Sequence, residues 1–112
     1  VNSGLNHLIR PMMYDAYHEI INVSSPDGDQ KMYTVVGNIC ETDTLGSDRK
    51  ISEIHEGDIL ALKNAGAYGY SMASNFNSRL RPAEVMVKNG KAHLIRQRDT
   101  FDDLLRGQIE VE

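Results

Sequence analysis

The sequence has no tryptophan, only two phenylalanines and a single cysteine. Without large aromatic residues, a core must be built from aliphatic residues, methionine and tyrosine. One cysteine permits no internal disulfide, which is typical of a reducing cytosol and predicts a cytoplasmic location. No apolar run is long enough to cross a bilayer, and no secretory signal peptide is recognisable. We therefore expect no association with a membrane.

Basic residues do not gather into the patch that nucleic-acid binding requires. Twelve lysines and arginines stand against sixteen acidic residues, which gives a net charge of −4 and predicts no nucleic-acid partner. The four histidines are scattered, and none has metal-ligand spacing with another histidine or with the cysteine. No metal site is therefore predicted. The length of 112 residues is sufficient for one small domain.

Turn residues at short intervals divide the chain into short apolar segments. Asn89-Gly90 separates two such segments and is the strongest hairpin signal in the chain. Thr100 and Asp103 have the spacing of a capping box and predict a final short helix. We expect strands over 17–23, 31–39, 59–63, 84–88 and 91–97, an extended course over 71–76, a loop over 42–49, and a helix over 6–16 broken at Pro11. This pattern predicts a mainly β fold, an antiparallel β-sandwich or small β-barrel with one or two short helices.

The cysteine lies at the end of an apolar, β-prone stretch. Val35 to Ile39 leads directly into Cys40, and the carboxylates Glu41 and Asp43 follow it. A strand that delivers a thiol and acids to its exposed end places chemistry on a rigid element. The alternative is a cysteine that is simply a small buried apolar residue.

Two further groups of residues have the chemistry of a binding site. Arg10 and Tyr14 are four residues apart and would share one helix face, which suits a carboxylate or phosphate oxygen. The alternative is a surface arginine and a packed tyrosine. The segment 65–69 is rich in small residues, so its backbone can approach a ligand, with Tyr68 as the polar group. The alternative there is a tight β-bulge or a strand crossing.

Two other features of the chain do not indicate a binding or catalytic site. The polar run 75–79 is most simply a solvated loop or turn. The lysines lie in predicted hairpins or exposed loops. None has the apolar setting that would lower a lysine pKa for covalent chemistry with a carbonyl.

Several segments, taken in order along the chain, resemble the C-terminal domain of the diaminopimelate decarboxylase family. They are LIRPMMYDAYH at 8–18, VGNICE at 36–41, AGAYGYSM at 65–72, SNFNSR at 74–79, RPAEV at 81–85 and RDTFDDLL at 98–105. Each motif is weak alone, but together they keep their order and span nearly the whole chain. The resemblance is therefore specific.

The resemblance implies a fold-type III, pyridoxal-phosphate-dependent decarboxylase with an alanine racemase-like fold. Such enzymes join an N-terminal (β/α)8 barrel, which carries the cofactor's lysine and most of the phosphate site, to a C-terminal β domain. Residues 1–112 would form that β domain, and 1–5 the last strand of the barrel. The chain starts at Val1 without a methionine, so we expect a piece of a longer protein that has no activity of its own.

The resemblance also implies roles for individual residues. Arg10 and Tyr14 would bind the distal carboxylate of meso-2,6-diaminopimelate, and Glu41 would bind its distal ammonium. Cys40, as the catalytic proton donor, and Glu41 would reach across a homodimer interface into the partner's site. Tyr68 would contact cofactor and substrate in its own subunit. The reaction would release CO2 and form L-lysine in lysine biosynthesis.

Two alternatives remain open from the sequence. A related pyridoxal-phosphate-dependent decarboxylase, acting on ornithine, arginine or carboxynorspermidine, would share the cysteine and the Gly-Ala-Tyr segment. Glu41 directly after the cysteine, together with Arg10-Pro11 and Ser78-Arg79, favours diaminopimelate. From a different class, the chain could be a non-catalytic β domain that binds a ligand or a partner. An upstream barrel in the gene would exclude that second alternative.

Overall fold

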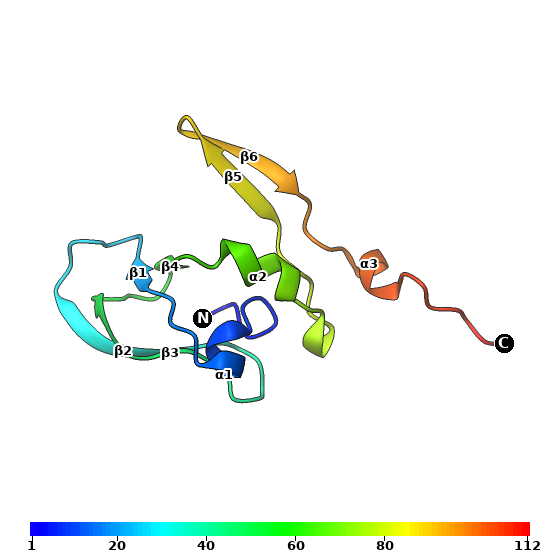
Figure 1. The fold of residues 1–112 in the computed structure, drawn as a ribbon, viewed down its shortest axis with the longest axis horizontal. Helices are drawn as coiled ribbons and strands as arrows, with labels where there is room; N and C mark the ends of the chain where they lie inside the picture. The colour runs from blue at the N-terminus through cyan, green and yellow to red at the C-terminus, as the bar shows by residue number, and fades with distance from the viewer.

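The computed structural model describes residues 1–112, in which three two-stranded antiparallel sheets are joined by short helices (Figure 1). The strand pairs are β1 (Ile20–Asn22) with β4 (Leu60–Leu62), β2 (Gln30–Val36) with β3 (Thr44–Ser52), and β5 (Glu84–Lys88) with β6 (Lys91–Arg96). The helical elements are α1 (Arg10–Tyr14), α2 (Gly66–Met72), the 3-10 turn η1 (Phe76–Ser78) and α3 (Phe101–Leu105). The prediction of a mainly β, antiparallel domain with short helices is confirmed.

A small apolar core joins the first two sheets. It consists of Ile20 from β1, Val35 from β2, and Leu45 and Ile51 from β3, all of them buried. Full burial of a side chain of this size stabilises the fold by about 1.5–3 kcal/mol. These four residues therefore fix how the β1–β4 sheet lies against the longer β2–β3 sheet.

The strand β3 corrects the prediction of a loop over 42–49. Gly46, a predicted loop residue, lies within β3 and opposite Val35 of β2. A Cβ at Gly46 would meet Cδ1 of Ile20 at 2.8 Å and the guanidinium of Arg49 at 3.0 Å. The glycine is thus required for close packing against β1, a tertiary constraint that local composition does not reveal.

The helix α2 corrects the prediction of extended chain at 71–72 and excludes the alternative of a β-bulge or strand crossing at 65–69. The amide N–H of Gly69 donates to the carbonyl of Ala65 at 2.7 Å, as in a helical turn. A Cβ at Gly66 or Gly69 would meet nothing within 4 Å. Small residues at these positions therefore do not mark a tight contact within this chain.

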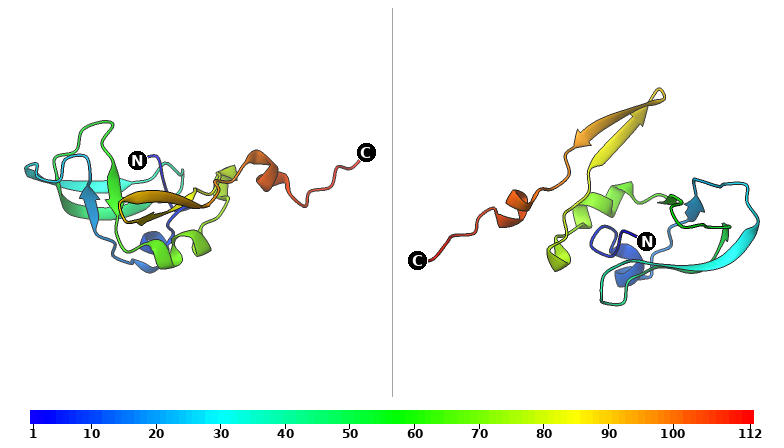
Figure 2. Two further views of the ribbon diagram at one scale, coloured as in Figure 1. Left: turned by 90° about the horizontal axis from the view of Figure 1, so that it is seen from above. Right: turned by 180° about the vertical axis from the view of Figure 1, so that it is seen from behind.

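Two predictions made from local sequence signals near the C-terminus, the hairpin and the capped helix, are confirmed. Asn89 and Gly90 both have positive φ, 50° and 71°, as a two-residue β5–β6 turn requires. The side chain of Asp103 accepts a hydrogen bond from the N–H of Thr100 at 2.7 Å, which completes the capping box. The β5–β6 hairpin projects from the rest of the domain, and the chain beyond α3 also extends away from the domain (Figure 2). None of the helices has the length and apolar character needed to cross a membrane.

A buried carboxylate ties the N-terminal segment to the turn between β2 and β3. Asp43 accepts the N–H of Leu5 at 2.7 Å and that of Ile39 at 3.1 Å. Its own carbonyl accepts the N–H of Gly37 at 2.7 Å. Asp43 is only 6% exposed, so the prediction that it lies at an exposed strand end is wrong. It is a structural anchor.

The anchor leaves no room for a side chain at Gly37. A Cβ there would lie 2.0 Å from Oδ2 of Asp43 and 2.7 Å from Cα of Gly4. We expect Gly37→Ala to lower the free energy of unfolding by about 1–3 kcal/mol, because overpacking forces the backbone to shift. Denaturant unfolding followed by circular dichroism measures this.

Gly69→Ala is the matched control. Its Cβ meets open space on a helix, so the same glycine-to-alanine change should leave stability unchanged or raise it by up to about 1 kcal/mol. Equal effects of the two substitutions would contradict the packing account of Gly37.

Candidate functional site

Cys40 lies on the turn 37–43, which connects β2 to β3 beyond the last residue of the strand. Its thiol is free and exposed, so the alternative of a buried apolar cysteine is wrong. The preceding residue, Ile39, is buried and held through its N–H by Asp43. The turn therefore exposes the Cys40 thiol to solvent, while Asp43 holds the backbone at the preceding residue.

Arg10 and Tyr68 lie together. The guanidinium carbon of Arg10 is 4.9 Å from the centroid of the Tyr68 ring, a cation–π contact between α1 and α2. Tyr68 is 53% exposed, so its hydroxyl is available to a ligand. The structure thus brings together two predicted site residues that are far apart in the sequence.

His18 holds Arg10 in place and was not predicted. The carbonyl of Lys63 can only accept, so Nδ1 of the buried His18 carries the proton that it donates at 3.0 Å. Nε2 is then an acceptor and receives a hydrogen bond from Nη1 of Arg10 at 3.4 Å. Arg10 keeps its other N–H donors free for a ligand. The spacing of His18 in the sequence gave no sign of this role.

Tyr14 shares α1 with Arg10, as predicted, but its ring is 60% exposed and makes no hydrogen bond within the chain. Pro11 occupies the first turn of α1, and Asp15, in the left-handed conformation, ends it after Tyr14. The helix is therefore shorter than the predicted 6–16. It is just long enough to carry Arg10 and Tyr14 one turn apart.

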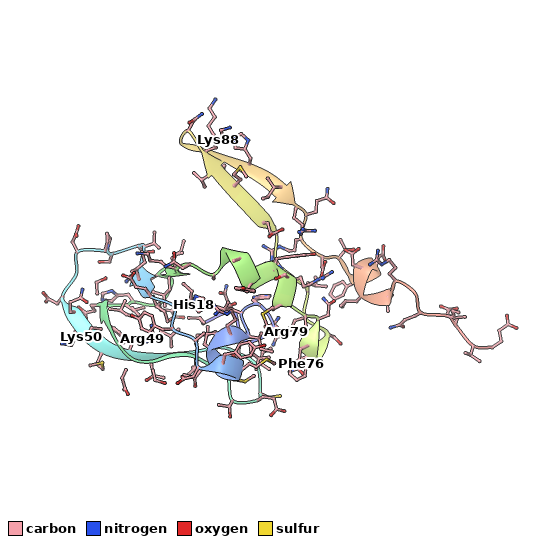
Figure 3. The ribbon with its side chains drawn as sticks, viewed as in Figure 1. His18, Arg49, Lys50, Phe76, Arg79 and Lys88 are labelled. Carbon is pink, nitrogen blue, oxygen red and sulfur yellow. The ribbon has the colours of Figure 1, made fainter.

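Glu41 borders an apolar pocket. The pocket is lined by residues from three stretches of the chain: Leu5, Ile9, Met12, Glu41, Thr42, Ser74 and Phe76. Glu41 is the one charged residue among them. Figure 3 shows Phe76 at the end of the domain that holds α1, away from Lys50 on the β2–β3 sheet. A carboxylate at the rim of apolar walls suits an aliphatic ligand with a cationic end.

The polar run 75–79 contains the exposed turn η1, as predicted, and Asn75 holds it through hydrogen bonds. The side-chain amide of Asn75 donates to the carbonyl of Arg79 at 2.8 Å and to Oδ2 of Asp99 at 3.0 Å. Asp99 also accepts from the backbone N–H and from Nε of Arg81, both at 3.0 Å. The Arg81 hydrogen bond, then that of Asn75, lowers the pKa of Asp99 to about 2. Asp99 is therefore ionised at neutral pH and clamps the turn η1.

The model of the pyridoxal-dependent decarboxylase C-terminal sheet domain matches residues 1–66, more than half of the chain. The chain belongs to this family.

Individual relatives of this sheet domain agree with the assignment. Diaminopimelate decarboxylase of Methanothermobacter thermautotrophicus is 52% identical over 110 residues, which are 96% of this chain and 26% of the relative. The Aquifex aeolicus enzyme is 45% identical over 99% of this chain and 27% of its own length. A crystal structure of Methanocaldococcus jannaschii diaminopimelate decarboxylase superposes with a TM-score of 0.90 at 39% identity, covering 98% of this chain and 25% of that one.

These matches confirm the predicted family and fold. The sheet domain is homologous to the C-terminal portion of diaminopimelate decarboxylase, a pyridoxal-phosphate-dependent enzyme. The chain spans about a quarter of the length of the curated relatives it matches. One solved structure similar to this domain, again at TM-score 0.90, is described as a co-complex with L-lysine.

All five lysines of the sheet domain are exposed, which suits a cofactor whose covalent anchor lies on another part of an enzyme. Lys31 pairs with Glu53 at 2.6 Å, and this hydrogen bond raises the pKa of Lys31, opposite to what covalent chemistry needs. Lys63 pairs with Glu19 at 2.8 Å. Tyr68, exposed and held beside Arg10, is the side chain here that fits a contact with an anionic, aromatic cofactor.

Proposed function

We propose that this sheet domain is the C-terminal part of a diaminopimelate decarboxylase, which converts meso-2,6-diaminopimelate to L-lysine and CO2. One observation carries the substrate assignment: the domain presents two opposite charges to a ligand, the exposed carboxylate of Glu41 on the Cys40 turn and the guanidinium of Arg10 beside Tyr68. The likeness to a diaminopimelate decarboxylase solved with L-lysine supports it. We further propose that the domain alone has no activity and that the enzyme works in the cytoplasm.

The two ends of the substrate would meet groups of opposite charge. Glu41 accepts hydrogen bonds from the distal ammonium, and the free N–H donors of Arg10, aided by Tyr14, bind the distal carboxylate. A substrate lacking either distal group leaves a site residue unpaired and is rejected. Ornithine lacks the distal carboxylate, so Arg10 discriminates against it.

Cys40 supplies the proton that replaces CO2. When bound, pyridoxal phosphate withdraws electrons from the carbon that loses CO2. A free thiol is mostly protonated at neutral pH, because its reference pKa is about 8.5, and it can donate to carbon. The exposure of Cys40 matches a role outside its own domain. Tyr68 contacts the cofactor and substrate in its own subunit.

The site is completed in a homodimer. Cys40 and Glu41 lie on one outward turn, whereas Arg10 and Tyr68 are tied to each other on α1 and α2. In a two-fold dimer, a turn that enters the partner's site is matched by the reciprocal insertion. We therefore assign Cys40 and Glu41 to the partner's site, and Tyr68 to the cofactor and substrate of its own subunit.

Glu41→Gln in the full-length enzyme tests the substrate assignment. The amide keeps the shape but loses the charge that pairs with the distal ammonium, a hydrogen bond worth about 1.5–3 kcal/mol. We expect kcat/KM for meso-diaminopimelate to fall by about tenfold or more in steady-state assays. Glu56→Gln, the same change on an exposed turn between β3 and β4, is the control and should behave as wild type. An unaltered kcat/KM for Glu41→Gln would remove Glu41 from the site.

Complementation between two inactive variants tests the arrangement in trans. One variant carries Cys40→Ala and the other lacks the barrel lysine that binds the cofactor. Random exchange gives about half mixed dimers, each with one intact site, so activity should recover to roughly a quarter of wild type. If Cys40 served its own subunit, every site would keep one defect and mixing would restore nothing. A pull-down with differently tagged subunits verifies that exchange has occurred.

A further inference from the structure

The side-chain amide of Asn77 reaches the candidate catalytic thiol. Nδ2 of Asn77 lies 3.7 Å from Sγ of Cys40 and donates a hydrogen bond to the sulfur. The two residues come from different elements, since Asn77 is on η1 and Cys40 is on the turn between β2 and β3. The contact is therefore made by the tertiary fold.

Asn77 is held in this orientation by an uncommon backbone conformation. Its φ and ψ are 57° and 30°, inside the left-handed region, and the next residue, Ser78, also has positive φ, at 56°. Asparagine tolerates this region better than most residues, but serine there carries a cost. Such a conformation persists where surrounding contacts determine it. Here Asn75, bound to the ionised Asp99 and to the carbonyl of Arg79, closes the turn on both sides of Asn77.

We propose that Asn77 is a positioning residue for Cys40, an inference that rests on the function proposed above. An N–H that occupies a sulfur lone pair leaves the thiol proton free to point toward the substrate. When the S–H bond breaks, its electron pair stays on sulfur, and the proton bonds to carbon through the electron pair that the loss of CO2 would leave there. The amide N–H then stabilises that negative sulfur, as donors do at charged acceptors, until water returns a proton.

The test measures the reactivity of Cys40 rather than turnover alone. In the full-length enzyme, the rate of Cys40 alkylation by iodoacetamide is followed against pH by peptide mass spectrometry, since the thiolate is the reacting form. Asn77→Asp keeps the size but replaces the donor by an anion. We expect alkylation at pH 7 to slow about tenfold and its pH midpoint to rise by about one unit, as for loss of a charge-assisted hydrogen bond. Asn77→Gly keeps the backbone and loses only the amide, so its shift should be smaller.

Asn89→Asp is the matched control. Asn89 also has positive φ, at 50°, but belongs to the β5–β6 turn, which lies far from the turn between β2 and β3 (Figure 1). Its alkylation profile should equal that of wild type. If Asn77→Asp gives the same midpoint as Asn89→Asp while circular dichroism shows both folded, the proposal is overturned.

Turnover separates this proposal from the proposed function. With both correct, Asn77→Asp lowers kcat several-fold with KM for diaminopimelate nearly unchanged, because the amide acts on the proton donor and not on the substrate. Should the alkylation midpoint shift while Cys40→Ala retains full turnover, Asn77 still positions the thiol, and the proposed role of Cys40 fails. Should the midpoint stay fixed while Cys40→Ala is inactive, the proposed function stands and the role of Asn77 falls.

Discussion

The buried carboxylate of Asp43 is the constraint on which this end of the domain depends. It satisfies two backbone N–H groups that are distant in sequence, those of Leu5 and Ile39, in a place that water does not reach. Hydrogen bonds to a charged acceptor contribute about 1.5–3 kcal/mol each, and buried donors left without a partner would cost a similar amount. Gly4 and Gly37 allow the approach, because a Cβ at either would collide with the carboxylate.

From this anchor, the site residues take their places through short links. The N-terminal segment held at Leu5 leads directly into α1, which carries Arg10 and Tyr14. The carbonyl of Asn6 accepts the N–H of Ser74 at 2.9 Å, so the chain entering η1 and Asn77 is tied to the same segment. Asp43 also binds the N–H of Ile39, and this fixes the position of the next two residues, Cys40 and Glu41. Asp43 thus helps to position residues from separate elements relative to one another. These residues are Arg10, Cys40, Glu41 and Asn77.

Much of the fold follows from local signals that the sequence displays. The Asn89-Gly90 hairpin and the Thr100 capping box depend on residues within a few positions of each other, and both were predictable. The strand β3 is not predictable from local composition, because a glycine such as Gly46 is typical of loops. Its reason for being there, the close packing of Ile20, appears only in the folded structure. The helix α2 was missed because its glycines weaken the helical pattern, and a helix this short needs tertiary support. The burial of Asp43 and the contact of Asn77 with Cys40 join distant segments, so spacing alone could not reveal them. Arg10, Tyr14, Cys40, Glu41 and Tyr68 are candidates by their residue types and spacing, whereas their specific roles come from the resemblance and stay predictions.

Amide hydrogen exchange at Leu5 and Ile39 measures the anchor most directly. In the wild-type protein both N–H groups should be strongly protected, because each is buried and bound to Asp43. In Asp43→Asn, which removes the charge at nearly constant volume, both should lose protection together, along with Gly37, while the β5–β6 hairpin exchanges as before. If Leu5 and Ile39 stay as protected as in the wild type, Asp43 does not hold the Cys40 turn, and the central claim is wrong.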